Sequence, residues 1–174
     1  MRGTANRRVA RKRGRVVAAT DVLIRYSGDV HDVGDVIGFH EEKLRQNGVV
    51  WLGKFGKPLG PARIAQMRAQ IMSEPGPSLY LVRRDRSGYV VHRGRIRQVT
   101  REVSDVDLHL VPAYYIRKRL LPLVGTWFLL TDLHEVGRET LDQLYLHSGN
   151  SAGDALRTSM AAHFFVRRVR SRVG

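Results

Sequence analysis

The chain has 174 residues, no cysteine, a hydrophobic fraction of 43% and a formal net charge of +14. This length suits one domain with a sizeable core, and the lack of cysteine excludes disulfides and thiolate metal sites. No segment reaches the roughly 18 consecutive apolar residues that a membrane helix needs. No apolar segment follows the arginine-rich start, as it would in a secretory signal. We therefore expect a cytoplasmic protein without a membrane partner.

The positive charge is concentrated at the two ends of the chain. Eleven of the 30 basic residues lie in residues 1–15 and 167–174, and neither segment contains an acidic residue. The intervening residues 16–166 carry a surplus of only +3. We therefore predict a disordered basic N-terminal tail (1–15), a single domain (16–166) and a basic C-terminal tail (167–174).

Polybasic tails indicate a nucleic-acid partner, because they bind phosphate backbones by releasing counterions. A membrane surface is less favoured, since residues 1–15 offer no bulky apolar face for insertion. Tails that are merely solvated are the remaining alternative. The tail residues that we expect to contact phosphates are Arg7, Arg8, Arg11, Lys12 and Arg13.

The first half of the domain contains several strand-like segments. The second part of residues 16–26 is β-branched and is predicted to be a strand that ends at a turn. Residues 33–40 and 49–53 are predicted to be two further strands of a hairpin that turns at Asn47-Gly48. Residues 54–61 form a basic loop whose glycines allow close approach to a ligand.

The clearest helix covers residues 62–74, where Ile64, Met67 and Ile71 recur at helical spacing before a Pro-Gly-Pro sequence. Residues 79–82 and 89–92 are predicted to form a hairpin, and residues 94–100 continue its second strand. Residues 113–116, 126–131 and 162–166 are also strand-like. Residues 140–146 and 152–162 fit either helix or loop. The pattern predicts an α+β, mainly β fold: a small β-barrel with peripheral helices and basic termini.

Sequence signatures of catalysis are absent. The chain has no phosphate-binding loop, no G-x-S-x-G elbow and no H-E-x-x-H helix. Its seven histidines are scattered singly, and the Asp132/Glu135 pair lacks the nearby lysine of a nuclease site. We therefore expect no enzyme, no metal and no other cofactor. A structural or assembly protein that binds RNA or DNA through its tails, and an RNA- or nucleotide-modifying enzyme, are the alternatives.

Aromatic residues recur beside basic ones in the domain. Bases stack on flat aromatic walls and phosphates need cations, so this interleaving favours nucleic-acid binding. Burial of each aromatic ring against its own sheet is the alternative. The expected base-binding residues are Trp51, Tyr114, Tyr115 and Trp127. The expected backbone-binding residues of the domain are Lys54, Lys57, Arg117, Lys118 and Arg119.

Residues 33–40 (Val-Gly-Asp-Val-Ile-Gly-Phe-His) and 48–53 (Gly-Val-Val-Trp-Leu-Gly) resemble the PUA-like superfamily, in particular its EVE and YTH branch. Residues 112–115 and 126–133 are similar to the later strands of EVE-like modules in modification-dependent restriction proteins of the McrB kind. The resemblance spans residues 20–166. It implies a PUA-like β-barrel that binds a modified base, flipped out of the helix into an aromatic pocket.

The resulting hypothesis is a nucleic-acid-binding reader domain, with DNA favoured over RNA, in a modification-dependent restriction or defence system. Such a protein would be associated with the nucleoid. Any cleavage or translocation would belong to a separate nuclease or ATPase subunit, because the chain has the signature of neither.

Overall fold

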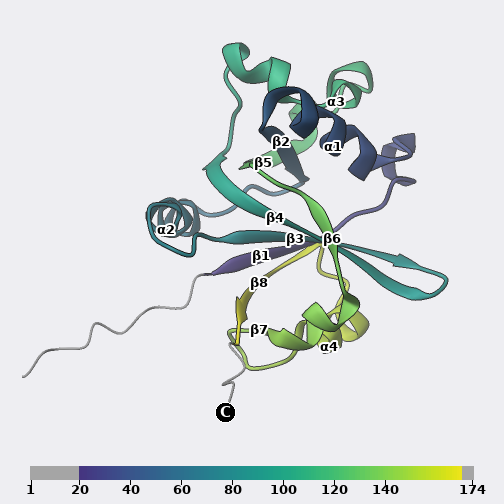
Figure 1. Cartoon of the computed structure of the whole chain (residues 1–174), viewed down its shortest axis with the longest axis vertical. Coiled ribbons are helices and arrows are strands. Elements are labelled where there is room, and N and C mark those ends of the chain that lie inside the picture. Colours follow the sequence, from purple (N-terminus) through teal and green to yellow (C-terminus); the bar gives the residue numbers. More distant parts are fainter. Residues whose placement is uncertain (1–19, 170–174) are drawn as a thin grey trace, which may run out of the picture.

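The computed structural model describes residues 20–169, which form a curved eight-stranded mixed sheet with helices packed around it (Figure 1). The strand order is β2-β5-β4-β3-β1-β8-β7, and β6 pairs with β4. Only the β1–β3 ladder is parallel among these pairs. The strands are β1 (Asp21–Arg25), β2 (Val50–Phe55), β3 (Ser78–Asp85), β4 (Gly88–Thr100), β5 (Val124–Leu130), β6 (His134–Val136), β7 (Leu144–Leu146) and β8 (His163–Arg168).

Short helices fill the connections between the strands. The α-helices are α1 (Val36–Asn47), α2 (Pro61–Ile71), α3 (Ala113–Arg117) and α4 (Ala152–Thr158). The 3-10 helices are η1 (Val30–Asp32), η2 (Asp105–Leu110), η3 (Leu121–Leu123) and η4 (Arg138–Gln143). None of the helices between residues 20 and 169 has the length and apolar character needed to cross a membrane.

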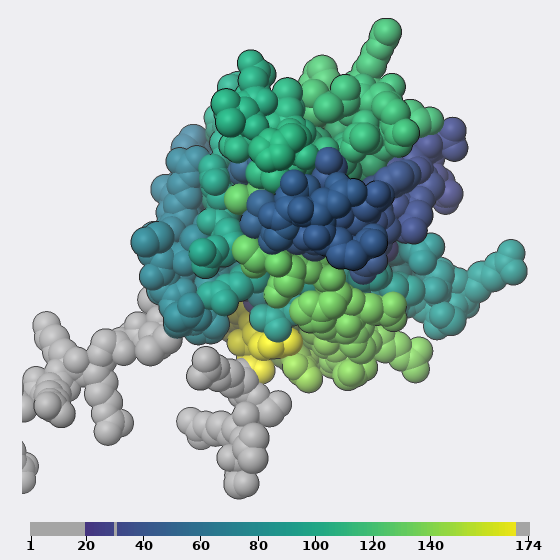
Figure 2. Space-filling view, turned by 45° about the horizontal axis from the view of Figure 1, so that its top comes forward, coloured from purple at the N-terminus to yellow at the C-terminus, as the bar shows by residue number. Residues whose placement is uncertain are grey.

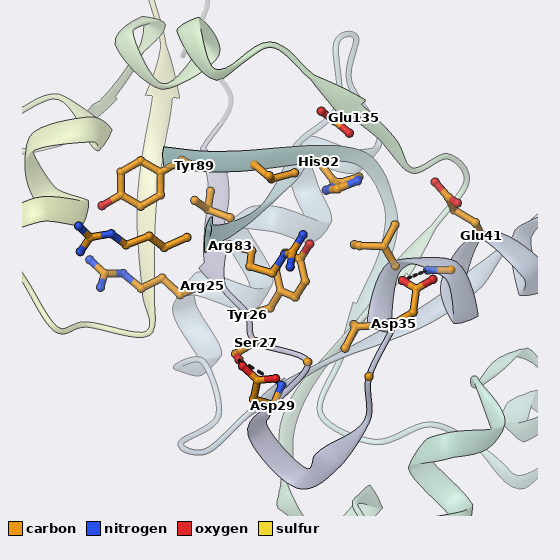
Figure 3. Close-up of a pocket in the computed structure, with 18 of the residues that line it drawn as sticks. Arg25, Tyr26, Ser27, Asp29, Asp35, Glu41, Arg83, Tyr89, His92 and Glu135 are labelled. Atoms are coloured by element: carbon orange, nitrogen blue, oxygen red, sulfur yellow. Dashed lines mark hydrogen bonds between the residues drawn. The ribbon is translucent and has the colours of Figure 1, made fainter. Parts of the chain in front are cut away.

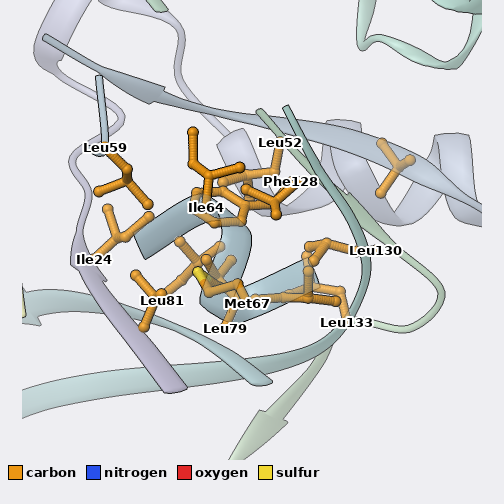
Figure 4. Packing of buried hydrophobic residues seen from close by; sticks show 14 of the residues in the cluster. Ile24, Leu52, Leu59, Ile64, Met67, Leu79, Leu81, Phe128, Leu130 and Leu133 are labelled. Atoms are coloured by element: carbon orange, nitrogen blue, oxygen red, sulfur yellow. The ribbon is translucent and has the colours of Figure 1, made fainter. Parts of the chain in front are cut away.

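Helix α2 packs its apolar face into the concave side of the sheet. Ile64 and Met67 are buried there against apolar side chains of β3 and β5, including Leu79 and Phe128 (Figure 4). Pro61 begins this helix, where its fixed φ is compatible with the first turn. The predicted helix at residues 62–74 is therefore confirmed, although it ends three residues earlier.

Strand β4 gives the sheet its curvature. Its first part pairs with β3 from Gly88 to Arg95, and its second part pairs with β5 from Ile96 to Thr100. The register shifts between Ile96 and Gln98, and such an irregularity bends a strand. The predicted β3–β4 hairpin is confirmed, as are the strands at β2, β5 and β8.

The predicted strand at residues 33–40 is wrong, because this region contains the start of α1. The Asp35 carboxylate accepts a hydrogen bond from the Gly38 amide at 2.9 Å and caps the helix. Ile37 and His40 then face inward at helical spacing, and the helix ends at Gly48 with φ of 74°. The strand-like segment at residues 113–116 is likewise helical, which allows the adjacent Tyr114 and Tyr115 both to be buried.

The sheet does not close into a barrel in the part of the chain that is described. Its order ends at β2 on one side and β7 on the other, and no ladder between described strands joins β2 to β1 or β8. Strand β8 continues to Arg168, two residues into the predicted C-terminal tail. The expected contacts at Arg7, Arg8, Arg11, Lys12 and Arg13 lie outside the described residues.

Candidate functional site

A pocket of about 200 Å³ lies at the seam where β2 approaches β1 without pairing with it. Ile24 and Arg25 come from β1, Gly53 to Phe55 come from β2, and Tyr114 and Tyr115 come from α3. Sites for drug-sized ligands usually measure about 300–1,000 Å³. The seam pocket is smaller, so its size suits a single ring system.

Three aromatic rings of the seam pocket form a near-parallel row. Phe55 and Tyr115 have ring centroids 5.9 Å apart at 27°, and Tyr115 and Tyr114 have centroids 4.3 Å apart at 25°. The exposed His31 ring lies beside this row, tilted by 50° to the Phe55 ring with the two centroids 5.2 Å apart. Phe55 is the partly exposed ring of the row, and a flat apolar surface of this kind is what a planar ligand needs for stacking.

The two tyrosine hydroxyls stay protonated in this environment. Burial raises the pKa of Tyr115 to about 12, and burial together with the adjacent Tyr115 raises the pKa of Tyr114. The Gly53 amide donates a hydrogen bond to the Tyr115 hydroxyl at 2.9 Å, which joins α3 to β2. The phenols therefore supply neutral polar groups next to the stacking surface.

Lys54 is the charged side chain of the seam pocket that is most buried, with only 4% of its surface exposed. Its ammonium group donates to the Lys57 carbonyl oxygen at 2.7 Å and, more weakly, to the Phe55 carbonyl oxygen at 3.4 Å. Burial lowers the pKa of Lys54, and no carboxylate of residues 20–169 pairs with it. A buried cation without an acidic partner favours an acceptor group on a ligand.

Exposed cations follow two walls of the seam pocket in the sequence. Lys57 follows the β2 wall, and Arg117, Lys118 and Arg119 follow the two tyrosines of α3. Lys118 lies 3.4 Å from the carboxylate of Asp32, whose neighbour Val33 lines the seam pocket.

Strained backbone occurs in the same segments. His31, Asp32 and Arg119 have positive φ values of 62°, 51° and 55°, which non-glycine residues rarely adopt. Their cost to stability is a feature of functional sites more often than of structural loops.

A larger cleft of about 1070 Å³ adjoins the seam pocket and shares Arg25, Tyr26, Ser27 and Val36 with it (Figure 3). Arg25, Arg83 and Tyr89 lie on one side, whereas Asp35, Glu41 and Glu135 lie on the other (Figure 3). His92, 8% exposed, also lines the cleft, and burial lowers its pKa. The cleft therefore has one cationic wall and one anionic wall.

The structure brings together some of the predicted site residues and separates others. Tyr114, Tyr115 and Lys54 line the seam pocket, where they are 3%, 1% and 4% exposed, and burial of Lys54 removes it from contact with a phosphate at the surface. Trp51 and Trp127 are 1% and 3% exposed, belong to the buried core and line neither the seam pocket nor the adjoining cleft. Their prediction as base-binding residues is therefore corrected.

Sequence reasoning missed the contributions of His31, Arg25 and Tyr26. A positive φ at His31 leaves no mark in the residue pattern, and Arg25 and Tyr26 end a strand that was predicted without reference to a site. Phe55 adjoins Lys54 in the predicted basic loop, and this position is the sequence signal that could have identified Phe55 as a site residue.

Comparisons of the chain with protein-family models, with curated proteins and with solved structures found no match. The PUA-like assignment therefore stays a prediction. Within residues 20–169 no group of three His, Asp or Glu side chains is arranged to hold a metal ion.

Proposed function

We propose that this chain is a DNA-binding reader domain that takes one flipped base into the seam pocket. The observation that carries the proposal is the combination, in one small pocket, of a row of stacked rings with Lys54, a buried cation that pairs with no carboxylate of residues 20–169. Unstacking a base costs a few kcal/mol, and base–aromatic stacking contributes about 1–3 kcal/mol. Contacts from Lys54 to a base carbonyl or ring nitrogen would add to that.

The surroundings of the seam pocket fit a nucleotide strand. Exposed Lys57, Arg117 and Arg119 offer phosphate contacts at the entrance, and the cationic wall of the cleft continues from it. The anionic wall repels phosphates, so the strand follows the arginine side. The basic terminal segments add a sequence-independent, salt-sensitive contribution.

In this proposal the curved sheet is the PUA-like barrel of the sequence prediction, opened at the seam through which the base enters. The setting that we propose is a modification-dependent restriction or defence system. Its nuclease or ATPase would be a separate subunit.

The test is a binding series on four duplexes that differ at one base: unmodified, N6-methyladenine, 5-methylcytosine and 5-hydroxymethylcytosine. Fluorescence anisotropy should show preference for one modified probe, and 2-aminopurine at the target position should brighten as it unstacks. Phe55→Ala should weaken binding to the preferred probe by about 1–3 kcal/mol and remove the preference.

Phe165→Ala is the matched control for Phe55→Ala. Phe165 is also half-buried, but it lies on β8 under the Arg63 guanidinium, whose carbon is 4.0 Å from the ring centroid. Its loss should lower stability without changing the preference among probes. Equal, weak binding of the unsubstituted protein to all four duplexes would contradict the reader proposal and support the structural alternative.

A further inference from the structure

The β3–β4 hairpin projects from the body of the molecule as a free two-stranded ribbon (Figures 1 and 2). We name residues 83–90 the arginine hairpin. Both faces of β3 are buried as far as Val82, and burial resumes on β4 at Val91. Between these points the strands stay paired, with Arg84 opposite Tyr89 and Asp85 opposite Gly88. The ribbon is thus ordered mainly by its ladder, and Tyr89 packs its base against the core cluster that contains Val82 and Val91.

The exposed side chains of the arginine hairpin are mainly cationic. Arg83, Arg84 and Arg86 are exposed, and none of them forms an ion pair with another described residue. The single acid, Asp85, accepts hydrogen bonds from the Ser87 amide at 2.8 Å and the Ser87 hydroxyl at 2.7 Å. These bonds lower its pKa and engage the carboxylate in the turn. Like charges on one ribbon repel, so the arrangement favours an anionic partner.

The base of the arginine hairpin connects it to the cleft. Arg83, Arg84 and Tyr89 line the cleft, and the Arg83 guanidinium lies beside Tyr26, which also lines the seam pocket (Figure 3). One continuous surface therefore runs from the tip of the hairpin, across the cationic wall, to the seam pocket. A duplex whose flipped base occupies the seam pocket would pass the hairpin.

We propose that the arginine hairpin enters the major groove of duplex DNA, with Arg84 and Arg86 directed to base edges. A two-stranded ribbon fits the major groove, which is about 12 Å wide, and not the minor groove of about 6 Å. The major groove of duplex RNA is too deep and narrow for side chains to read. Arginine forms bidentate hydrogen bonds with guanine O6 and N7 in the major groove. The inference rests on the proposed function for its partner, but it concerns a separate surface.

The chain lacks cysteine, so one introduced thiol locates the hairpin directly. Ser87→Cys at the exposed turn should form a disulfide with duplex DNA whose tether on cytosine N4, in the major groove, ends in a mixed disulfide, because the protein thiolate displaces the small thiol of that disulfide. A duplex tethered at guanine N2, in the minor groove, should react much less. Gln46→Cys on the exposed side of α1 is the control and should react with neither. Equal trapping in both grooves, or trapping only from guanine N2, would overturn the inference.

Affinity provides the second readout. The double variant Arg84→Gln/Arg86→Gln should weaken duplex DNA binding by about 5- to 150-fold, the range of a lost bidentate base contact. On duplex RNA of the same sequence the double variant should lose no more affinity than the control variant Arg45→Gln/Arg97→Gln. This control removes the same charge from exposed positions elsewhere. Equal losses on DNA and RNA would show that the hairpin contributes charge alone and would overturn the inference.

The two proposals fail in different ways. The hairpin variant should weaken binding to modified and unmodified duplexes alike and keep their ratio, whereas the Phe55 variant should lose the ratio. If the protein is trapped in the major groove but binds all four probes equally, the hairpin inference stands and the flipped-base proposal is wrong. If the protein prefers a modified base but is not trapped in the major groove, the reader proposal stands and the hairpin inference is wrong.

Discussion

Trp51 and Phe55 lie four residues apart on the same face of β2, yet their surroundings differ. Trp51 is 1% exposed beneath Val111, Tyr114 and Leu120, whereas Phe55 is half-buried and carries the exposed His31 ring. The β2–β5 register shifts between Lys54 and Phe55, and beyond this irregularity Phe55 has Tyr115 of α3 on one side and the exposed His31 ring on the other. Two aromatic residues on one strand therefore differ in role because of what packs over them.

Substituting Trp51 should give the largest effect and should distinguish the surroundings of Trp51 from those of Phe55 most clearly. Trp51→Ala should lower the free energy of unfolding by about 3–5 kcal/mol, because it leaves a cavity in a sealed core. Affinity per folded molecule should stay unchanged. Urea unfolding combined with anisotropy titration separates the two quantities. A large loss of affinity without loss of stability would return Trp51 to the site.

Two buried ionisable groups make the stability of the core depend on pH. Burial raises the pKa of Asp21 to about 6, against the effect of the Ser78 amide and of Arg93 and Arg168. Burial lowers the pKa of His40 to about 4, against the effect of the Val36 carbonyl. At 1.36 kcal/mol per pKa unit, each shift corresponds to about 3 kcal/mol.

The two contributions have opposite signs. Between pH 3.8 and about 6 the folded state binds the Asp21 proton more tightly, so stability falls as pH rises. Between about pH 4 and 6.5 the unfolded state binds the His40 proton more tightly, so stability rises with pH. Relative to the unsubstituted protein, Asp21→Asn should therefore show a steeper rise of stability with pH, and His40→Gln should show a fall. Unfolding curves at pH 4, 5 and 6 test this, and parallel pH profiles for all three proteins would refute it.

A smaller effect is expected at Lys54, which precedes Phe55 on β2 and lines the same pocket. Lys54→Met keeps the approximate length of the side chain and removes a buried charge that pairs with no carboxylate between residues 20 and 169, so stability should hold or increase. Binding to the preferred probe should weaken by about 1.5–3 kcal/mol, the usual value of a hydrogen bond to a charged group. Paired melting and anisotropy measurements give both values. Undiminished affinity would exclude an ammonium–base contact.

The smallest expected effects are at the entrance. Lys57→Gln and Arg117→Gln should each reduce the slope of log affinity against log salt by about 1, without changing the preference among modified probes. Arg45→Gln, on exposed α1, should leave the slope unchanged. Titrations at four salt concentrations measure these slopes. A slope that responds equally to all three substitutions would show that the entrance has no special role.

Several elements could be predicted because their signals are local. Ile64 and Met67 at helical spacing before a proline stop identify α2, and the Asp85-to-Gly88 turn between alternating strands identifies the β3–β4 hairpin. Helix α1 was missed because Val33 to Phe39 alternates apolar and small residues in a way that also fits a strand. The hydrogen bond from the Gly38 amide to the Asp35 carboxylate caps the helix and favours helix over strand in this segment.

The hydrophobic periodicity of these elements, the adjacent tyrosines of α3 and the cations beside aromatic residues all follow from the order of residues alone. Tertiary structure decided which of those residues share a site. The seam pocket forms because a hydrogen bond from the Gly53 amide to the Tyr115 hydroxyl, across 62 positions, holds α3 against β2 beside the end of β1. Such long-range packing depends on the strand order and on which elements pack over each strand. Neither is encoded in the local pattern of residues.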